Sequence, residues 1–510
     1  MARPLMVRMI LPLIIVLHLV IASLLALKLN LWVDEAYSLH TTGAGLRYAV
    51  LQALHFENQP PLYFLLLWAW RQVNSSLFFA RLFSIGCSFL TLLCVARWSR
   101  HRFPNLHPAL PVAAVALNPL TVGAAVDARS YGLVLLLSAS LLAAFYGGFW
   151  ALGTDKKARV AFTVLAAAAL YTQYYLAFLL VAFGALIFLN RRTQLPHYLA
   201  SVAIALAAFV PMIFVLMHQL RVASASTFAP ASAYDNAWQV ASVFLRFVFP
   251  VPALPHAATV VLWCALLALV GLCVLALRRH GSADRFDLTA ITVLAGVLIL
   301  TALTIFNQQI TARYAAGLFV VTVLAAYAWL YDKDRERQPA AAALTAIAAL
   351  LSIVSLIQIY QPMAKTGDWQ RVAAYIMQNE KAGEPIMIFE ANEALPLAHY
   401  YGGLNVVVPV PSALRFDTYD VRRNVIGSEA DIGKALGERN ASAAQAWLVT
   451  TDYCKWLTID FHCDLLDRFV ARHYVVKSRR TFFHSTVRLL GRRGAAPLTD
   501  TQRGEFAPRG

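Results

Sequence analysis

Long apolar runs, interrupted by short polar segments, fill most of the first 360 positions of this chain. Apolar stretches of about 18 residues or more predict helices that span a membrane. The pattern predicts eleven spans, at roughly 8–29, 77–96, 108–125, 131–150, 160–175, 176–190, 197–217, 257–277, 288–306, 314–331 and 340–360. Basic residues precede the first run and no small-residue cleavage site follows it, so we expect it to remain as a transmembrane helix.

Two apolar regions depart from this regular pattern. The predicted spans 160–175 and 176–190 are short and form a tight hairpin around residues 171–175. Segment 60–70 is apolar and aromatic but too short to span, so we expect an interfacial or re-entrant helix there. The two prolines that open this segment suit the first turn of a helix.

Residues 362–493 show a different pattern, with more charge and shorter apolar runs. Short buried strands are predicted at 385–389, 405–409 and 446–450, and helices at 368–379, 393–401 and 428–439. This alternation predicts a small α/β domain with a mainly parallel sheet. No Gly-x-Gly-x-x-Gly motif follows a strand, so nucleotide binding is not indicated. We therefore expect a transmembrane domain over 1–361, an α/β domain over 362–493 and a disordered tail over 494–510.

The composition supports a membrane protein, because 59% of the 510 residues are hydrophobic and only 14% are charged. Soluble domains average about 45–50% apolar and about 25% charged residues. The net charge of +16 raises the question of nucleic-acid binding. We exclude nucleic acid as a partner because the basic residues gather in every second loop, as the positive-inside rule requires.

The same alternation of charge predicts the orientation of the chain. It places the N-terminus in the cytoplasm and the 362–493 domain outside it. The cytoplasmic loops then hold Arg97, Arg100, Arg102, Lys156, Lys157, Arg159, Arg191, Arg192, Arg278, Arg279, Arg285, Lys333, Arg335 and Arg337. If segment 60–70 spanned the membrane, the basic loop at 97–102 would fall outside and break the pattern.

The six cysteines fall into two groups. Four lie in apolar segments and read as small core residues. Cys454 and Cys463 lie in the polar C-terminal region, where a disulfide is plausible if that region faces an oxidising compartment. No Cys-x-x-Cys pair points to zinc.

Four polar clusters lie at the outward ends of the predicted helices. They are Asp34-Glu35, His55-Phe56-Glu57-Asn58-Gln59-Pro60-Pro61-Leu62-Tyr63, Asp127-Ala128-Arg129-Ser130-Tyr131 and Arg313-Tyr314. Acids are scarce on this face of the spans, so two adjacent carboxylates after the first span require an explanation. A solvated loop start is the simplest one, and a catalytic carboxylate at the membrane surface is the functional one.

These clusters suit the transfer of a sugar that is activated by a lipid phosphate. An acceptor hydroxyl needs a base to take its proton, and Asp34 is our candidate. The anionic leaving group needs a cation, and the forked guanidinium of Arg313 is our candidate.

Each residue also has a purely structural explanation. Asp127 and Arg129 can pair at a helix start. Arg313 can contact a lipid head group. The tyrosines at 63, 131 and 314 can be ordinary interfacial aromatics, and the polar side chains of His55 and Glu57 can simply be solvated.

The four clusters, in this order, resemble the GT-C membrane glycosyltransferases, in particular the bacterial branch similar to protein O-mannosyltransferases and lipid A aminoarabinose transferase. The motifs that carry the resemblance are Leu31-Trp32-Val33-Asp34-Glu35-Ala36-Tyr37, Gln59-Pro60-Pro61-Leu62-Tyr63, Asp127-Ala128-Arg129-Ser130-Tyr131-Gly132, Arg313-Tyr314 and Asp368-Trp369-Gln370. Gln59 departs from the family, whose members often have His there.

The resemblance implies an inverting glycosyltransferase in a bacterial inner membrane, with a polyprenyl-phosphate sugar as donor. It implies that Asp34 is catalytic with Glu35 beside it, and that Arg313 and Arg129 bind the donor phosphate. The polar residues Asp127, His55, Glu57, Gln59, Tyr63, Tyr131 and Tyr314 would bind substrate or support the site. Some GT-C enzymes use a divalent metal, but no metal-ligand cluster in this sequence secures one, and no other cofactor is indicated.

Two other functions share lipid-linked substrates and several spans. A transporter or flippase for a lipid-linked saccharide would carry polar residues near the middle of its spans, and few are present here. A glycan polymerase or ligase would transfer a preassembled block rather than one sugar. The acceptor, whether a lipid, a glycan or a protein, and the sugar itself are not specified by the sequence.

Overall fold

The computed structural model describes residues 5–150, 155–225, 233–252, 258, 260–261, 264–265, 286–305, 312–331, 338–456 and 459–494. The chain divides into two compact units. The first contains residues 1–29 and 37–363, and the second contains residues 30–36 together with residue 364 onward. The short segment 30–36, which carries Asp34 and Glu35, therefore packs with the C-terminal part of the chain.

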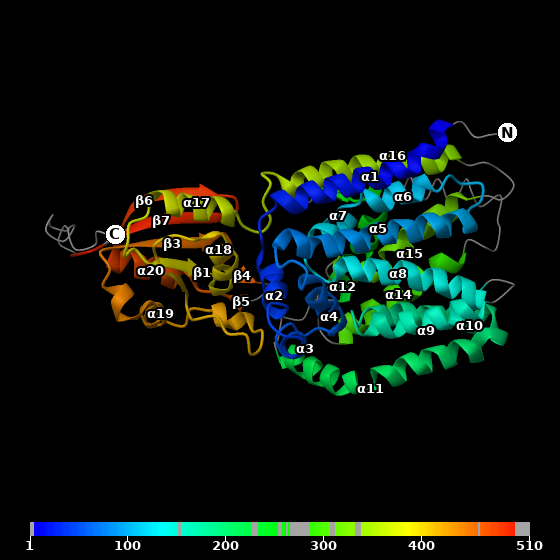
Figure 1. The fold of residues 1–510 in the computed structure, drawn as a ribbon, viewed down its shortest axis with the longest axis horizontal. Helices are drawn as coiled ribbons and strands as arrows, with labels where there is room; N and C mark the ends of the chain where they lie inside the picture. The colour runs from blue at the N-terminus through cyan, green and yellow to red at the C-terminus, as the bar shows by residue number, and fades with distance from the viewer. Residues whose placement is uncertain are drawn as a thin grey trace. The chain divides into compact units, whose positions relative to one another are not determined.

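The first unit is helical (Figure 1). Its helices are α1 (Leu5–Lys28), α2 (Val33–Thr41), α3 (Leu46–His55), α4 (Leu62–Arg71), α5 (Leu77–Arg102), α6 (Ala109–Ala116), α7 (Pro119–Val126), α8 (Tyr131–Phe145), α9 (Lys156–Leu170), α10 (Leu176–Asn190), α11 (Leu195–Ala225), α12 (Ala233–Val248), α14 (Phe286–Ile305), α15 (Ala316–Leu330) and α16 (Gln338–Tyr360). A π-helical turn over Tyr146–Trp150 continues α8, and a short 3-10 turn over Arg192–Gln194 precedes α11. The first residues of α2 belong to the second unit.

Six helices in the described part of the chain are long and apolar enough to cross a membrane. A seventh span results if α6 and α7 are counted as one segment bent by 60°. The bend follows from the sequence, because Pro119 cannot continue a helix and Asn118 caps the new one by accepting a bond from the Leu120 amide at 2.9 Å. The predicted count of eleven is thus not reproduced by length and composition.

The difference in count has an identifiable origin. The predicted hairpin at 160–190 is present as α9 and α10, but each has 15 residues and is therefore only about 22 Å long. The predicted span at 314–331 likewise corresponds to a 15-residue helix, α15. Segment 60–70 forms the ten-residue helix α4, too short to span as expected. The predicted span at 257–277 lies almost entirely outside the described residues.

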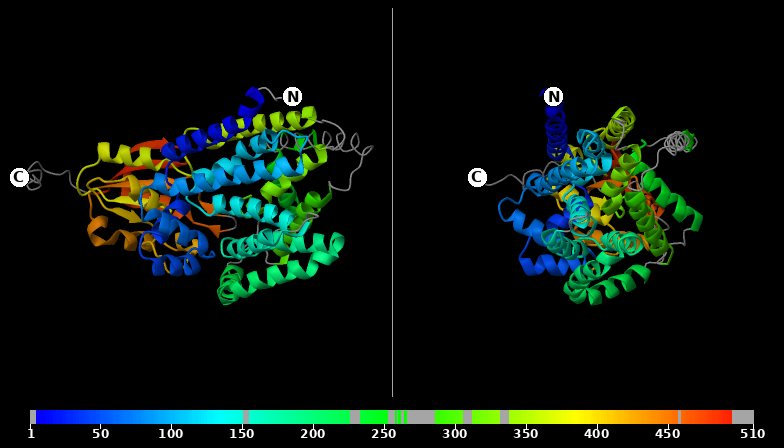
Figure 2. Two further views of the ribbon diagram at one scale, coloured as in Figure 1. Left: turned by 45° about the vertical axis from the view of Figure 1, so that its right-hand side comes forward. Right: turned by 90° about the vertical axis from the view of Figure 1, so that its right-hand side faces the viewer.

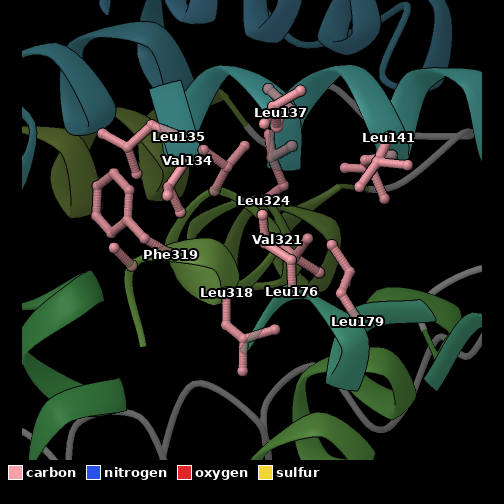
Figure 3. Packing of buried hydrophobic residues seen from close by; sticks show 14 of the residues in the cluster. Val134, Leu135, Leu137, Leu141, Leu176, Leu179, Leu318, Phe319, Val321 and Leu324 are labelled. Atoms are coloured by element: carbon pink, nitrogen blue, oxygen red, sulfur yellow. The ribbon is translucent and has the colours of Figure 1, made fainter. Parts of the chain in front are cut away.

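The core of the first unit is built around α8, which contacts α5, α9 and α15. Figure 3 shows apolar side chains of α8, α10 and α15 meeting in one cluster, among them Val134, Leu176 and Val321. Gly317 on α15 permits this close packing, since a Cβ atom there would lie 2.6 Å from the Leu176 side chain. The Gly317 carbonyl also accepts a hydrogen bond from Ser138 of α8. Helices α9, α10 and α11 contact one another and remain adjacent in the further views (Figure 2).

The second unit is a three-layer α/β sandwich. Its elements are α17 (Trp369–Asn379), β1 (Ile386–Phe389), a 3-10 turn (Ala391–Glu393), α18 (Ala394–Tyr400), β2 (Val407–Pro409), a 3-10 turn (Val421–Asn424), α19 (Glu429–Ala441), β3 (Gln445–Thr451), β4 (Lys455–Trp456), β5 (Ile459–Asp460), α20 (Cys463–His473), β6 (Tyr474–Phe482) and β7 (Ser485–Arg492). Apolar residues of α17 and α18 cover one face of the sheet, and those of α19 and α20 cover the other. All four residues of β1 are buried, as expected for a strand covered on both faces.

The main sheet is mixed rather than mainly parallel, which corrects the expectation from sequence. Its strand order is β2-β1-β3-β7-β6. β1 is parallel to β2 and β3, whereas β7 is antiparallel to β3 and β6. The antiparallel pair was missed because β6 lacks an apolar face: all but its first and last residues are exposed. The helices and strands predicted between 368 and 450 are present with boundaries shifted by a few residues.

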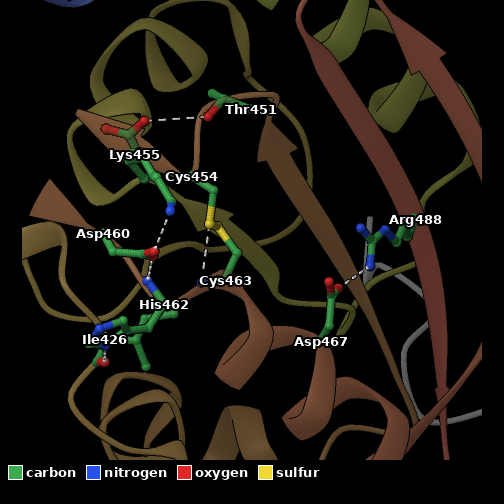
Figure 4. Close-up of a disulfide and its surroundings, with 10 residues drawn as sticks. Ile426, Thr451, Cys454, Lys455, Asp460, His462, Cys463, Asp467 and Arg488 are labelled. Atoms are coloured by element: carbon green, nitrogen blue, oxygen red, sulfur yellow. Dashed lines mark hydrogen bonds and ion pairs between the residues drawn. A yellow bond between two sulfur atoms is a disulfide. The ribbon is translucent and has the colours of Figure 1, made fainter. Parts of the chain in front are cut away.

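Cys454 and Cys463 form a disulfide in the second unit (Figure 4). It closes the small hairpin of β4 and β5, where Lys455 pairs with Asp460 at 3.1 Å. The side chain of His462 reaches the Ile426 carbonyl at 3.0 Å and links this hairpin to the segment before α19. The predicted tail beyond residue 494 lies outside the described residues.

Candidate functional site

Asp34 and Glu35 occupy the first turn of α2, where carboxylates interact favourably with the helix dipole. Their environments differ. Glu35 is completely buried and forms an ion pair with Lys365, with 2.8 Å between Oε2 and Nζ. Asp34 is half-buried and does not share this deep burial. The two adjacent acids are therefore not equivalent: Glu35 is held by a buried lysine, and Asp34 is the more accessible carboxylate.

The segment before α2 is fixed by polar contacts within the second unit. The side-chain Nδ2 of Asn30 donates to the Gly367 backbone carbonyl at 3.3 Å, and the side-chain Oδ1 of Asn30 accepts from the backbone N–H of Gln370 at 3.2 Å. The backbone amide of Leu31 donates to the Tyr400 hydroxyl at 2.7 Å. The Asp368-Trp369-Gln370 motif thus holds in place the segment of chain that precedes Asp34.

Two further carboxyls of the second unit, Glu390 and Glu393, interact with each other, and Glu393 also interacts with Asp34. Glu393 is buried, and desolvation together with the charges of Glu390 and Asp34 raises its pKa to about 8. Desolvation also raises the pKa of Glu390 to about 7. Both residues follow β1 directly, at the carboxyl end of the parallel strands. Asp34 therefore belongs to a group of three acids, two of which hold protons near neutral pH.

A second group of polar side chains surrounds Arg129 in the first unit. Its Nη1 atom lies 2.8 Å from Glu57 Oε2 and 3.0 Å from the Ser38 hydroxyl. The other oxygen of Glu57 accepts from the Thr41 hydroxyl at 3.3 Å. The exposed fractions of the Arg129 and Glu57 side chains are 7% and 3%. The structure therefore brings two predicted clusters together, as a buried ion pair between the loop after α3 and the loop before α8.

Arg313 lies just before α15 among aromatic side chains of the first unit. Its guanidinium carbon is 5.9 Å from the centre of the Tyr131 ring, within cation–π range. The neighbouring Tyr314 stacks on Tyr175 with 5.5 Å between ring centres. The Gln173 amide donates to the Arg313 carbonyl at 3.5 Å. Arg313 and Tyr314 are both exposed, whereas Arg129 is buried, so the two candidate phosphate-binding arginines differ in accessibility.

Four of the other predicted site residues, Tyr63, His55, Gln59 and Asp127, lie in the first unit. Tyr63 is buried in the hydrophobic core of the first unit, where its ring packs against Phe64 and Phe83. His55 is exposed at the end of α3, and Gln59 is half-buried in the loop that follows. Asp127 ends α7, and its backbone carbonyl accepts a bond from Ser84 at 2.6 Å.

The described residues do not suit a metal. Over the ranges that the structure describes, no group of three or more His, Cys, Asp or Glu side chains is arranged to hold an ion. We therefore derive no chemical step through a metal.

Sequence reasoning missed three residues of the second unit that bear on Asp34 and Glu35: Lys365, Glu390 and Glu393. Lys365 follows the last predicted span as a single basic residue outside every motif that the sequence offered. The two glutamates have a recognisable signal, because both follow a buried strand, where the carboxyl ends of parallel strands collect functional side chains.

Comparisons with known proteins found matches to solved structures but none to family models or curated proteins. No family model matches the chain, and no curated protein matches it. Fifteen chains of solved structures do match. One is ArnT from Cupriavidus metallidurans, solved with bound undecaprenyl phosphate, which is 12% identical to this chain with a TM-score of 0.53. The similarity covers 94% of this chain and 97% of that one.

The chain has the fold of ArnT. This confirms, at the level of the fold, the resemblance to GT-C proteins that the four motifs indicated. It also confirms the expected fold class, a multi-pass helical membrane protein with a small C-terminal α/β domain. The likeness spans both units, so the α/β domain is part of the shared architecture.

Proposed function

We propose that this protein is an inverting glycosyltransferase, which moves a sugar from a polyprenyl-phosphate donor to an acceptor hydroxyl at the extracytoplasmic membrane face. The observation that carries the proposal is the shared fold with ArnT, a protein solved with undecaprenyl phosphate, over nearly the whole chain. A fold supports many chemistries, so the proposal also depends on the side chains that could perform the reaction.

In the proposed reaction the acceptor oxygen attacks the anomeric carbon from the side opposite the phosphate. The bond between that carbon and the phosphate oxygen breaks, and the leaving group departs as polyprenyl phosphate. The hydroxyl proton passes to Asp34, which acts as general base. Asp34 suits this role better than Glu35, because Asp34 is half-buried and can be reached by an acceptor, whereas Glu35 is completely buried.

The phosphate of the donor carries negative charge that increases as the bond breaks. A guanidinium can neutralise it with two parallel hydrogen bonds. We assign this role to Arg313, which is exposed and lies beside aromatic rings that suit a lipid boundary. Arg129 is assigned a supporting role, because its charge is balanced by Glu57.

The extracytoplasmic location is supported by the disulfide between Cys454 and Cys463. Disulfides persist in oxidising compartments and are rare in the bacterial cytoplasm. The positive-inside pattern of the basic loops supports the same orientation.

The test of the base is the substitution Asp34→Asn, which keeps the shape of the side chain but removes its basicity. We expect sugar transfer to fall at least about 100-fold, the usual contribution of a general base. The measurement is mass spectrometry of membrane glycolipids and glycoproteins from cells with each variant. Asp155→Asn is the matched control, because Asp155 is an exposed helix cap and Asn is an equally good cap. Full activity of Asp34→Asn would exclude Asp34 as the base.

The test of the phosphate site is Arg313→Ala, with exposed Arg47 of α3 changed to Ala as control. Loss of a charge-assisted contact of about 1.5–3 kcal/mol should weaken donor use by about 10- to 100-fold. Donor titration of the purified protein in detergent measures this as a rise in KM. Equal effects of the two substitutions would remove Arg313 from the donor site.

The same mass spectra separate the proposal from the other two functions. A product that gains one sugar supports the transferase. A product that gains a block of sugars would indicate a ligase or polymerase instead. Translocation of a lipid-linked saccharide in reconstituted vesicles, with no new glycosidic bond, would indicate a transporter.

A further inference from the structure

The second unit has an edge at which several polar side chains collect. β1 lies between β2 and β3, and all three are parallel, so the chain leaves β1 toward one side and later returns on the other. Ligands of open α/β sheets bind outside the carboxyl ends of the strands at such a reversal. Glu390 and Glu393 follow β1 at this edge. Thr451 ends β3, and its hydroxyl donates to Glu390 Oε1 at 3.5 Å.

Two polar atoms at this edge are buried without a hydrogen-bond partner. They are Oε2 of Glu393 and Oδ1 of Asn392, which are close together in the same 3-10 turn. Glu393 is only 8% exposed. A buried polar atom without a partner costs about 1–3 kcal/mol, and such atoms are uncommon in native proteins. The Asn392 oxygen accepts hydrogen bonds, whereas the Glu393 carboxyl donates when it is protonated and accepts when it is ionised. A ligand that satisfies both atoms must therefore be able to donate and to accept, as a hydroxyl group does.

The charges around Glu393 restrict the ligand further. Its charged neighbours are the carboxyls of Glu390 and Asp34, so an anion is disfavoured. Glu390 holds its contacts loosely, with 3.4 Å to the Asn424 amide and 3.5 Å to Thr451, so it can exchange them for a ligand. Metal coordination is not supported, since no suitable group of ligands is present among the described residues.

An aromatic side chain borders the same acids. Tyr453, two residues beyond the end of β3, is 46% exposed, and the charges of Glu393 and Glu390 act on it. One face of its ring lies against His484, with 5.9 Å between ring centres. Carboxyl and amide groups beside a partly exposed aromatic ring match the mixed surface of a sugar, which has hydroxyl groups that donate and accept and apolar C–H faces.

We propose that Glu390, Asn392 and Glu393 form a saccharide-binding subsite, which receives hydroxyl groups of the acceptor beside Asp34. That the bound saccharide is the acceptor rests on the proposed glycosyl transfer. The binding itself rests only on the edge of the sheet and its unsatisfied polar atoms. The acceptor of this protein is therefore a glycan or glycolipid rather than an unmodified peptide or a simple lipid.

Direct binding is the test. Saturation-transfer NMR on the full chain in detergent uses methyl glycosides of glucose, galactose, mannose and N-acetylglucosamine as probes, and ethanolamine as a cationic probe. We expect at least one glycoside to bind. Glu393→Leu should weaken that binding about tenfold or more, which corresponds to the loss of one or two hydrogen bonds. Glu393→Gln keeps polar atoms at this place and should retain binding within about threefold.

Glu438→Gln provides the control, because this exposed acid lies on α19, away from the carboxyl end of β1. The leucine variant should still fold, since it removes a buried polar atom that lacks a partner. The near-ultraviolet circular dichroism of each variant checks this. Binding of ethanolamine in place of every glycoside, or glycoside binding that is unchanged in Glu393→Leu, would overturn the proposal.

The outcome can be separated from that of the transferase proposal. Glycoside binding that depends on Glu393, in a protein without transferase activity, would leave the subsite standing and reject the transfer. Transferase activity with the same acceptor KM in Glu393→Leu as in the unmodified protein would reject the subsite and leave the transfer standing.

Discussion

At the scale of single residues, adjacent positions in this chain have unlike roles. Asp34 and Glu35 share one helical turn, but Glu35 is completely buried and paired with Lys365, whereas Asp34 is half-buried. The sequence could identify the pair as unusual, because acids are scarce near the predicted spans. It could not distinguish the two members, because the partner of Glu35 is 330 positions away in the chain. Burial and long-range pairing are properties of the fold that local pattern does not contain.

The ion pair between Arg129 and Glu57 allows a prediction at the same scale. Glu57→Gln removes one charge of a buried ion pair, so the free energy of unfolding should fall by about 3–5 kcal/mol. The double substitution Glu57→Leu with Arg129→Met removes both charges and should cost much less. Thermal unfolding in detergent measures both effects. Additive losses in the double variant would show that the pair is not coupled.

At the scale of elements, periodicity predicted the helices and central strands well, because apolar faces impose regular spacing. The break between α6 and α7 was hidden within one continuous apolar run. The edge strand β6 was missed because its exposed residues do not alternate, and its charges protect an open sheet edge from further pairing. The candidate clusters at helix ends were found by sequence, whereas the contact between Arg129 and Glu57 required the packed helices.

The packing of α15 against α10 allows a prediction at this scale, because Gly317 sets the distance between the two helices. Gly317→Ala places a Cβ atom 2.6 Å from the buried side chain of Leu176, and the resulting overpacking should cost about 1–3 kcal/mol. Gly86→Ala in α5 is the control, because nothing lies within 4 Å of its Cβ position. That control should stabilise its helix by about 0.5–1 kcal/mol. Melting temperatures that move in the same direction for both variants would contradict the close approach.

At the scale of the whole molecule, a change in charge and in the length of apolar runs predicts a membrane part over 1–361 and an α/β part over 362–493. The chain divides into two compact units. The sequence pattern did not assign residues 30–36 to the second unit, since their chain neighbours are membrane helices. The mixed sheet was likewise beyond local pattern, because strand order is determined by contacts between distant segments.

The raised pKa values of Glu393 and Glu390 make stability depend on pH. The folded state holds protons that the unfolded state has released, so the free energy of unfolding should decrease as pH rises from about 4.5 to about 8. Each unit of pKa shift corresponds to about 1.4 kcal/mol, so the two shifts together should change the free energy of unfolding by several kcal/mol, about 8 kcal/mol at most. Thermal unfolding at pH 5 and pH 8.5 measures it. Glu393→Leu should flatten this dependence, and an equal slope in the variant would show that Glu393 is not responsible.

The early position of residues 30–36 has a consequence for biosynthesis. A ribosome adds about 5–20 residues per second, so Glu35 emerges roughly 15–65 s before Lys365 exists to neutralise it. During that interval the segment that carries Asp34 has none of the anchors supplied by Gly367, Gln370 and Tyr400. The nascent chain must therefore synthesise all the helices between these residues before the segment that carries Asp34 gains its partners.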